Sequence, residues 1–321
     1  MRMEEADLAS AWTVPDRVDP GTFDEYDVML DAGDRAVPGT VTVPRGAHAG
    51  PGAVLLGGGG PFDRDYTFGP NKPLKDLAWG LASRGIVVVR FDKVTYTHPE
   101  VTADPDFTVA VEYVPHAVSA LRLLRESENV DPVRTFVVGH SMGGKLAPRV
   151  AAAEPTVAGL VLLAADAEPM HRAAVRVARY LASVAPSAQA DAMVETFTRA
   201  AAVVDSPGLS RETPAHVLPF GMGGAYWLDL LHYDQVGTAA ALPQPMLLLQ
   251  GDRDYQVTVE DDLSRWRAGL ASRTDVTIRT YPAANHMFFP GTGPSTAAEY
   301  EPAQHVDPAA VDDIADWILR H

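Results

Sequence analysis

The sequence predicts an α/β fold, a doubly wound and mostly parallel sheet that carries a helical lid insertion and an N-terminal antiparallel hairpin. Short, continuous apolar runs alternate with helical patterns along most of the chain, as a parallel sheet with helical crossovers requires. The alternation stops at about 167–238, where no strand run occurs. A chain of 321 residues is long enough for one large domain with such an insertion.

The N-terminal part does not share this alternation. Residues 1–22 lack apolar periodicity and contain Pro15 and Pro20, so we expect an irregular arm. Residues 23–44 alternate between apolar and polar positions on both sides of a turn-forming stretch at 31–34. Such alternation is typical of a half-exposed antiparallel hairpin. We therefore expect this hairpin at an edge of the sheet.

The strands of the core are predicted by short apolar runs, as in strands that are buried on both faces. These runs lie at 53–56, 86–91, 135–139, 160–164, 246–250 and 276–281. Helical patterns lie at about 72–84, 108–126, 143–153, 260–272 and 309–320. The expected organisation is an arm at 1–22, a first core part at 23–166, the lid at 167–238 and a second core part at 239–321.

The insertion contains two alanine-rich segments followed by a loop-like stretch, which favours a helical lid. Inserted between two core strands, it would lie over the carboxyl ends of the sheet, where α/β folds bind ligands. Its last part is rich in aromatic residues and methionine, which suit the lining of an apolar pocket, although helix packing explains them about as well. The candidate substrate-binding residues are Phe220, Met222, Tyr226 and Trp227.

Composition and charge argue against several classes of function. Acidic residues outnumber basic ones by 42 to 26, a formal charge of −16 that repels nucleic acid and anionic membranes. The absence of cysteine removes disulfides, thiolate metal sites and a cysteine nucleophile. The histidines are scattered singly, so we expect no metal. An acidic N-terminus without an apolar run predicts a cytoplasmic protein that does not span a membrane.

The strongest motif is Gly139-His140-Ser141-Met142-Gly143, which directly follows a predicted strand and directly precedes a predicted helix. A serine in such a tight strand-to-helix turn projects its hydroxyl over the sheet, and the flanking glycines avoid collisions with neighbouring backbone. A glycine-rich turn with an incidental serine is the alternative. We predict that Ser141 is a nucleophile.

A serine nucleophile needs a base, which in this pattern follows later in the chain, after an acid. His286 lies in a loop after the last strand run, and a structural histidine is the alternative reading. Asp254 lies a few residues past the run at 246–250 and so has room to reach and orient the imidazole, whereas Asp252 is close enough to the turn to cap it. Asp252 and Asp166 remain alternatives for the acid.

The oxyanion that forms during acyl transfer needs preorganised N–H donors. Four glycines at 57–60 follow a predicted strand and supply flexible backbone there. We predict that the amides of Met142 and Gly59 are the donors, with Gly58 as the competitor of Gly59. The glycine run lacks the spacing of a phosphate-binding loop.

At these residues the chain resembles the α/β-hydrolase superfamily, in particular bacterial serine hydrolases of the dienelactone-hydrolase and acyl-peptidase-like branch. The resemblance implies the α/β-hydrolase fold, with Ser141 as nucleophile, Asp254 as acid and His286 as base. Two positions depart from the pattern: Gly57 stands where many relatives have histidine, and Val94 where a basic residue often occurs. The resemblance covers nearly everything after residue 23 and is carried by the stretches 60–65, 69–73, 76–82, 139–144, 251–257 and 285–288.

We therefore interpret the chain as a serine hydrolase that cleaves a carboxylic ester, thioester or lactone through an acyl-enzyme, without a cofactor. The expected partner is a small molecule with an apolar acyl or aryl part. Two other functions fit the same residues. A biosynthetic enzyme could use the site for lyase, cyclase or carbon–carbon coupling chemistry, and a non-catalytic binding protein could keep an idle triad.

Overall fold

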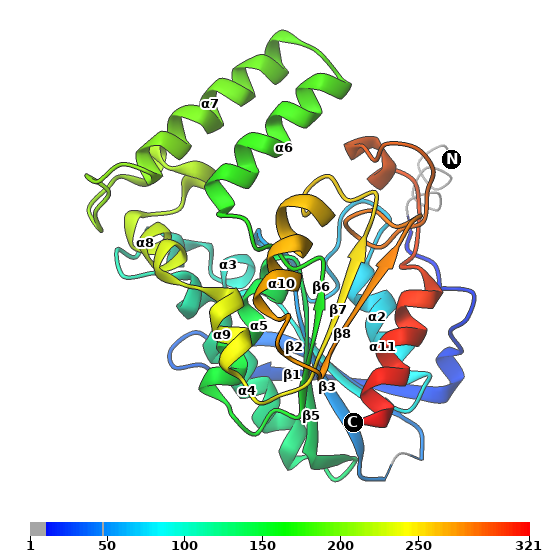
Figure 1. The fold of residues 1–321 in the computed structure, drawn as a ribbon. Helices are drawn as coiled ribbons and strands as arrows, with labels where there is room; N and C mark the ends of the chain where they lie inside the picture. Colours follow the sequence, from blue (N-terminus) through cyan, green and yellow to red (C-terminus); the bar gives the residue numbers. More distant parts are fainter. Residues whose placement is uncertain (1–10, 47) are drawn as a thin grey trace, which may run out of the picture.

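A computed structural model describes residues 11–46 and 48–321 of the chain. Its centre is an eight-stranded sheet with the strand order β1-β2-β4-β3-β5-β6-β7-β8 (Figure 1). β1 is antiparallel to β2 and β2 to β4, whereas the other neighbouring strands are parallel. The predicted fold class, with its antiparallel hairpin at the sheet edge, is confirmed. The strands are β1 (Phe23–Leu30), β2 (Val37–Pro44), β3 (Gly50–Leu56), β4 (Val87–Phe91), β5 (Val130–His140), β6 (Gly159–Leu163), β7 (Met246–Gly251) and β8 (Val276–Tyr281).

The central strands are apolar on both sides because helices cover both faces of the sheet. In β3, Ala53 and Leu55 belong to one hydrophobic core, whereas Val54 and Leu56 belong to the other. This alternation follows from strand geometry, in which successive side chains point to opposite faces. The continuous apolar runs of the sequence are the consequence.

Two layers of helices enclose this sheet (Figure 1). α2 and α11 pack on one face, and α4, α5 and α10 pack on the other. α2 and α11 approach closely at Gly80, where a Cβ atom would lie 2.6 Å from Cγ1 of Val311. The bounds of the helices outside the insertion are α2 (Pro73–Ala82), α3 (Val94–Thr97), α4 (Val109–Glu126), α5 (Met142–Ala153), α10 (Ser264–Gly269) and α11 (Pro308–Arg320).

The carboxyl ends of the central strands lie in one row. Leu56 at the end of β3 pairs with Gly139 of β5, and Leu163 at the end of β6 pairs with both His140 and Leu249. The loops that follow β3, β5, β6 and β7 therefore meet at the same edge of the sheet. This is the edge at which open α/β sheets bind ligands.

The segment between β6 and β7 is helical. It contains α6 (Met170–Val184), α7 (Ala188–Val204), α8 (Gly224–His232) and α9 (Gln235–Ala241). α6 and α7 pack together as a hairpin that projects from the body of the protein (Figure 1). α9 packs against α5 and α10 of the core, and the predicted boundary at residue 238 falls inside it. A separate lid with limits at 167 and 238 stays a prediction.

The described part of the N-terminal arm, from residue 11 on, contains one 3-10 turn, Pro20–Thr22, before β1. Trp12 fastens this arm to the core. Its indole N–H donates to Asp76 at 2.8 Å, and its ring meets that of Trp79 edge to face at 4.9 Å. The start of the predicted irregular arm, residues 1–10, lies outside the described residues.

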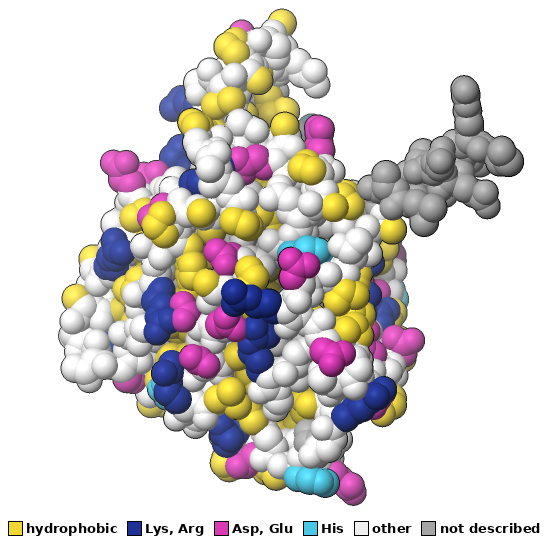
Figure 2. Space-filling model, turned by 90° about the vertical axis from the view of Figure 1, so that its right-hand side faces the viewer, with side chains coloured by type: hydrophobic (Ala, Val, Ile, Leu, Met, Phe, Trp, Pro, Cys, Tyr) yellow, Lys and Arg dark blue, Asp and Glu magenta, His cyan; other side chains and the backbone are white. Residues whose placement is uncertain are grey.

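The surface carries interspersed acidic and basic side chains on the face shown in Figure 2. Ion pairs such as Arg84 with Asp312 and Arg279 with Asp313 are partly exposed, so each contributes little to stability. Within residues 11–46 and 48–321, no helix combines the length and apolar character needed to cross a bilayer. A cytoplasmic location stays a prediction.

Candidate active site

Ser141 occupies a strained turn between β5 and α5. Its φ and ψ angles are 54° and −122°, and its N–H donates to the carbonyl of Leu163 at 2.8 Å. Side chains do not fit around this turn: a Cβ atom at Gly139 would lie 2.3 Å from the carbonyl oxygen of Gly143, and one at Gly143 would lie 2.4 Å from that of Leu56. Glycine is therefore required on both sides of the serine.

His286 lies in the loop after β8 and is buried. Its Nδ1 is 2.7 Å from Oδ2 of Asp254, which is buried in the loop after β7. The other oxygen of Asp254 accepts the backbone N–H groups of Gln256 at 2.7 Å and Val257 at 2.9 Å. These contacts fix the orientation of the carboxylate, which in turn fixes the imidazole ring.

The structure brings Ser141 and His286 together in the lining of one pocket. In the described part of the structure, no hydrogen bond joins the hydroxyl of Ser141 to the imidazole of His286. Such contacts are often long before a substrate binds. The site therefore contains a hydroxyl, an imidazole and a buried carboxylate. Their catalytic roles stay a prediction.

The two alternative acids occupy other positions. Asp252 is exposed and makes no side-chain contact with His286. Asp166, in the loop after β6, lines the pocket but binds Nζ of the buried Lys145 at 2.5 Å. Asp254 is thus the carboxylate that the structure places beside the imidazole.

Met142 and Gly59, the predicted oxyanion donors, line the same pocket as Ser141. Within the described residues, neither backbone N–H has a hydrogen-bond acceptor. Gly58 passes directly beside the serine, because a Cβ atom there would lie 3.0 Å from the Cβ atom of Ser141. Two residues whose N–H groups have no acceptor among the described residues therefore line the pocket together with Ser141, and their role as oxyanion donors stays a prediction.

Tyr66 is a residue of this pocket that the sequence analysis did not name. It adopts a φ of 60°, and its hydroxyl would lie 2.6 Å from a Cβ atom at Gly58. Burial raises the pKa of Tyr66 above its ordinary value, so the hydroxyl keeps its proton. A tyrosine in a loop carries no pattern in the sequence that would single it out.

His140 is a second residue that the sequence analysis did not assign, although it is part of the serine motif. Its Nε2 is 2.8 Å from the carbonyl oxygen of His286. Burial, reinforced by the nearby imidazole of His286, lowers the pKa of His140 to about 3. The ring is therefore neutral near pH 7 and, with its proton on Nε2, donates a hydrogen bond that ties the serine turn to the loop of His286.

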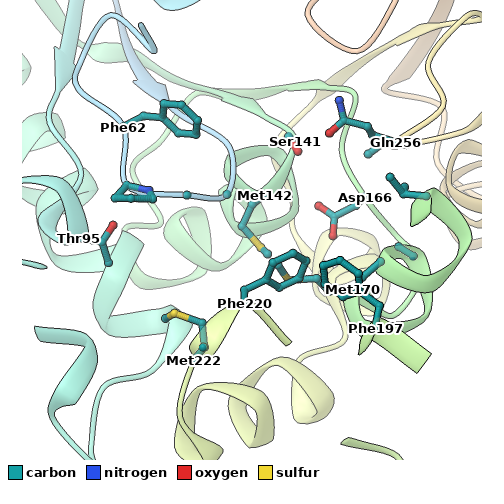
Figure 3. Close-up of a pocket in the computed structure, with 18 of the residues that line it drawn as sticks. Phe62, Thr95, Ser141, Met142, Asp166, Met170, Phe197, Phe220, Met222 and Gln256 are labelled. Carbon is teal, nitrogen blue, oxygen red and sulfur yellow. The ribbon is translucent and has the colours of Figure 1, made fainter. Parts of the chain in front are cut away.

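The pocket has a volume of about 850 Å³ and is lined mainly by apolar side chains. Figure 3 shows Ser141 and Asp166 facing a group of methionine and phenylalanine side chains. Of the predicted binding residues, Phe220, Met222 and Tyr226 line this pocket. Trp227 does not: it is fully buried and borders a smaller cavity of about 100 Å³.

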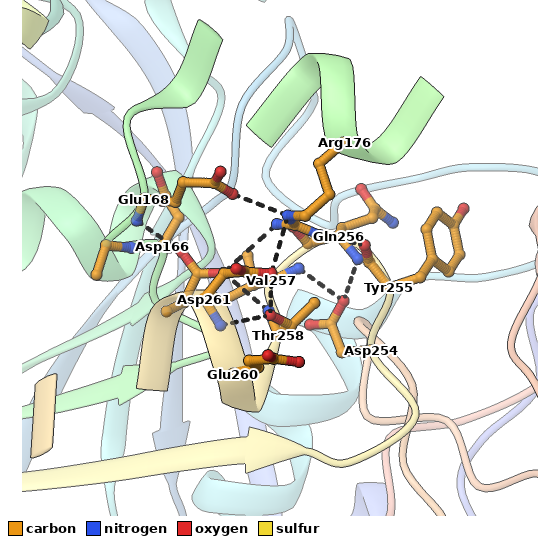
Figure 4. A network of polar contacts seen from close by, with 12 residues as sticks. Asp166, Glu168, Arg176, Asp254, Tyr255, Gln256, Val257, Thr258, Glu260 and Asp261 are labelled. Carbon is orange, nitrogen blue, oxygen red and sulfur yellow. Dashed lines mark hydrogen bonds and ion pairs between the residues drawn. The ribbon is translucent and has the colours of Figure 1, made fainter. Parts of the chain in front are cut away.

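Arg176 of α6 joins the insertion to the loop that carries Asp254 (Figure 4). Its guanidinium donates to the carbonyl oxygens of Tyr255 at 3.0 Å and Gln256 at 2.9 Å, and it pairs with Glu168 at 2.8 Å. The residues whose amides hold Asp254 are thus partly held from the insertion. No motif predicts this contact, because Arg176 lies far from Asp254 in sequence.

The described part of the chain contains no candidate metal site. No group of three or more His, Cys, Asp or Glu side chains is placed there to hold a metal ion.

Comparisons with known proteins find hydrolases among the relatives of this chain. Residues 73–291 match the hydrolase family described as serine aminopeptidase, S33. The chain is 34% identical over 310 residues to esterase EstD of Thermotoga maritima, covering 96% of this chain and 71% of that protein. It is 28% identical over 191 residues to a monoacylglycerol lipase of Mycolicibacterium smegmatis, covering 58% of this chain and 62% of that protein.

Solved structures show the same fold at low sequence identity. Est1E of Butyrivibrio proteoclasticus has a TM-score of 0.58 at 14% identity, covering 92% of this chain and 98% of Est1E. A dienelactone hydrolase from Anabaena variabilis has a TM-score of 0.53 at 16% identity, covering 94% of this chain and 99% of that protein. These likenesses establish the arrangement of strands and helices and leave the substrate to other arguments.

Proposed function

The chain belongs to the serine aminopeptidase S33 family of α/β-hydrolases, and we propose that it is an esterase whose triad is Ser141, His286 and Asp254. The observation that carries this proposal is the buried pair of His286 and Asp254, with Nδ1 and Oδ2 2.7 Å apart, in which His286 lines the same pocket as Ser141. Ester hydrolysis is supported by the relative that aligns with 96% of the chain, an esterase.

In the proposed acylation step, the hydroxyl oxygen of Ser141 attacks the substrate carbonyl, and Nε2 of His286 takes its proton. Nδ1 donates to Asp254, which leaves Nε2 free to act as the base. The imidazolium then returns the proton to the departing alcohol. In the second step, a water molecule gives a proton to His286 and attacks the carbonyl carbon of the acyl-enzyme. His286 then returns this proton to the departing oxygen of Ser141, which releases the acid and restores the serine hydroxyl.

The negative charge on the carbonyl oxygen is held by the N–H groups of Met142 and Gly59 in this proposal. Met142 is the first residue of α5, so the helix N-terminus adds a favourable field. Donors of this kind act on charge that forms only in the transition state. Within the described residues these two N–H groups have no hydrogen-bond acceptor, which supports their role as oxyanion donors.

The proposed substrate is a small ester with an apolar acyl or aryl part. The pocket lies within the range of about 300–1,000 Å³ that holds small molecules. Its lid side is made of apolar side chains of α6 and α7, Ala174, Val177, Leu181 and Phe197 among them. A thioester or lactone of similar shape would meet the same groups.

The test combines covalent labelling with a panel of esters of graded acyl length, aryl lactones and thioesters. Wild type should react with a fluorophosphonate at Ser141 and hydrolyse part of the panel. Ser141→Ala should lose labelling and lower turnover by about 10⁴- to 10⁶-fold. Ser264→Ala on the exposed start of α10 is the matched control and should behave as wild type.

Three outcomes would contradict the proposal. A Ser141→Ala protein with more than a tenth of wild-type turnover would remove the nucleophile assignment. Conversion of substrate without net hydrolysis, at full rate in Ser141→Ala, would indicate biosynthetic chemistry at the same site. A folded wild type that neither labels nor turns over any ester would indicate a binding protein.

A further inference from the structure

A buried cation lies under the glycine loop beside Ser141. Nζ of Lys93 is 2.9 Å from the carbonyl oxygen of Gly58, and the hydroxyl of Tyr113 donates to the same oxygen at 2.8 Å. Lys93 also donates to the Tyr113 hydroxyl at 2.8 Å. Both side chains are more than nine-tenths buried. One carbonyl oxygen is thus held by two donors that support each other.

A counter-charge keeps this cation in place. Glu112 lies 2.8 Å from Nζ of Lys93 and is itself held by the hydroxyls of Tyr226 at 2.7 Å and Thr95 at 3.1 Å. Burying an ion pair is costly unless its hydrogen-bonding groups are satisfied. Here they are satisfied, because the three N–H groups of Lys93 meet three acceptors: the carbonyl oxygen of Gly58, the hydroxyl of Tyr113 and the carboxylate of Glu112.

The held carbonyl belongs to the peptide unit whose N–H is that of Gly59. In a trans peptide the C=O and the following N–H point in opposite directions, and the described residues contain no cis peptide bond. Fixing the oxygen of Gly58 toward Lys93 therefore fixes the N–H of Gly59 on the other side. A Cβ atom added at Gly59 would meet nothing within 4 Å, so no neighbouring side chain crowds this side of the peptide.

From these contacts we propose that Lys93 and Tyr113 are positioning residues for ester hydrolysis. They hold the Gly58–Gly59 peptide so that the Gly59 N–H points at the oxyanion, and the ammonium polarises that amide into a stronger donor. The proposal rests on the proposed esterase function and deepens it. It assigns the donor role to Gly59 rather than Gly58, and it gives a catalytic consequence to a buried ion pair of which Glu112, but not Lys93, lines the pocket.

The first test is Tyr113→Phe, which removes one hydroxyl and keeps the ring. We expect kcat to fall by about 3- to 10-fold, the effect of one hydrogen bond, with KM nearly unchanged. Lys93→Met combined with Glu112→Gln removes both charges together, which avoids leaving one charge buried alone. For this double variant we expect a fall in kcat of about 10²-fold, as for an impaired oxyanion donor.

A trifluoromethyl ketone separates positioning from general damage, because the serine adds to it and forms a tetrahedral oxyanion. Its inhibition constant should rise in proportion to the fall in kcat/KM. The matched control is Arg273→Met, which removes a partly buried cation from backbone carbonyls at the opposite edge of the sheet. It should lower the melting temperature and leave kcat and the inhibition constant as in wild type.

Chemical rescue tests the charge itself. The chain contains no cysteine, so Lys93→Cys provides a single thiol that can be alkylated in denaturant before refolding. Alkylation with 2-bromoethylamine restores an ammonium group and should restore most of the lost kcat, whereas neutral alkylation with iodoacetamide should not. Wild type taken through the same refolding sets the reference.

The results separate this proposal from the esterase assignment. If wild type hydrolyses esters and Ser141→Ala does not, the esterase assignment stands. Unchanged kcat and unchanged ketone affinity in Tyr113→Phe and in the double variant would then overturn the positioning role. Equal recovery with both alkylating reagents would overturn the role of the charge. An inactive wild type would instead overturn the esterase assignment.

Discussion

The two sides of the pocket are built by different means. On the side of the sheet, Ser141, His286 and Asp254 lie in loops whose backbone and side chains are held by hydrogen bonds. On the side of the insertion, the lining consists of small or apolar side chains on α6 and α7, many of them only half buried. The side of the sheet fixes the positions of the reacting groups, and the side of the insertion determines the shape of the pocket. Residues that perform chemistry need the first kind of support, since small displacements lower the rate strongly.

The two sides meet at Arg176, which holds the carbonyl oxygens of Tyr255 and Gln256 from α6. Because the amide of Gln256 binds Asp254, one residue links the insertion to the proposed catalytic acid. The comparison therefore predicts that changes on the sheet side alter rate for every substrate, whereas changes on the insertion side alter the ranking of substrates.

The largest effect is expected for Asp254→Asn on the sheet side. An amide in place of the carboxylate cannot stabilise the imidazolium and favours the wrong tautomer, so kcat should fall by about 10³- to 10⁴-fold for all esters. Steady-state rates across the ester panel measure this. Asp252→Asn, two residues away and exposed, is the control and should keep wild-type rates. An Asp254→Asn protein within tenfold of wild type would reopen the choice of acid.

The next effect concerns Trp227, which the structure places outside the pocket. Trp227→Ala should remove about 3–5 kcal/mol from the free energy of unfolding, because a fully buried ring leaves a cavity. Relative rates among esters should stay the same. Chemical denaturation and the ester panel measure the two quantities. A changed substrate ranking with unchanged stability would return Trp227 to the substrate-binding residues.

A smaller effect is expected on the insertion side. Val177→Trp fills part of the pocket beneath α6, so long acyl chains should lose about 10- to 100-fold in kcat/KM relative to short ones. The ratio of rates for long and short esters measures this. Thr198→Trp, on an exposed position of α7 outside the lining, should leave the ratio unchanged. Equal losses for all chain lengths would place the acyl group elsewhere.

The smallest effect is expected at His305, which belongs to neither side of the pocket. The hydrogen bond that His305 donates to the carboxylate of Asp76 raises the pKa of His305, so the charged ring stabilises the folded state. This contribution is fully present below about pH 6.5 and is lost as the pH rises through the raised value. Because the ring is partly exposed, the difference in unfolding free energy between wild type and His305→Gln should stay below about 1 kcal/mol. It should vanish by pH 9. A difference that persists at that pH would point to packing instead of charge.

The sequence predicted the core well because its signals are local. The apolar run at 246–250 lies within β7, and that at 276–281 coincides with β8. A strand that is buried on both faces is apolar at consecutive positions, so it can be recognised in the sequence. The glycines around Ser141 are equally local, since the turn leaves no room for a Cβ atom. The hairpin of β1 and β2 was predicted because apolar and polar residues alternate there with a period of two.

The insertion was predicted as helical, but the positions of its side chains were not. Trp227 and Tyr226 are neighbours in sequence on α8, and only Tyr226 lines the pocket. Neighbouring helical residues point in directions about 100° apart, and the sequence does not say which direction meets the sheet. That choice depends on how α8 packs against α4.

By itself, the sequence determined the α/β class, the order of the elements and the residue types that could serve as nucleophile, base and acid. Tertiary structure decided which carboxylate meets His286, because Asp254 and Asp166 both follow buried strands and differ only in their partners. It also placed Lys93 under the carbonyl of Gly58, 35 residues away along the chain. The reason is physical: strand and turn patterns arise from neighbours in sequence, whereas partners of buried charges are set by the packing of segments that are distant in the chain.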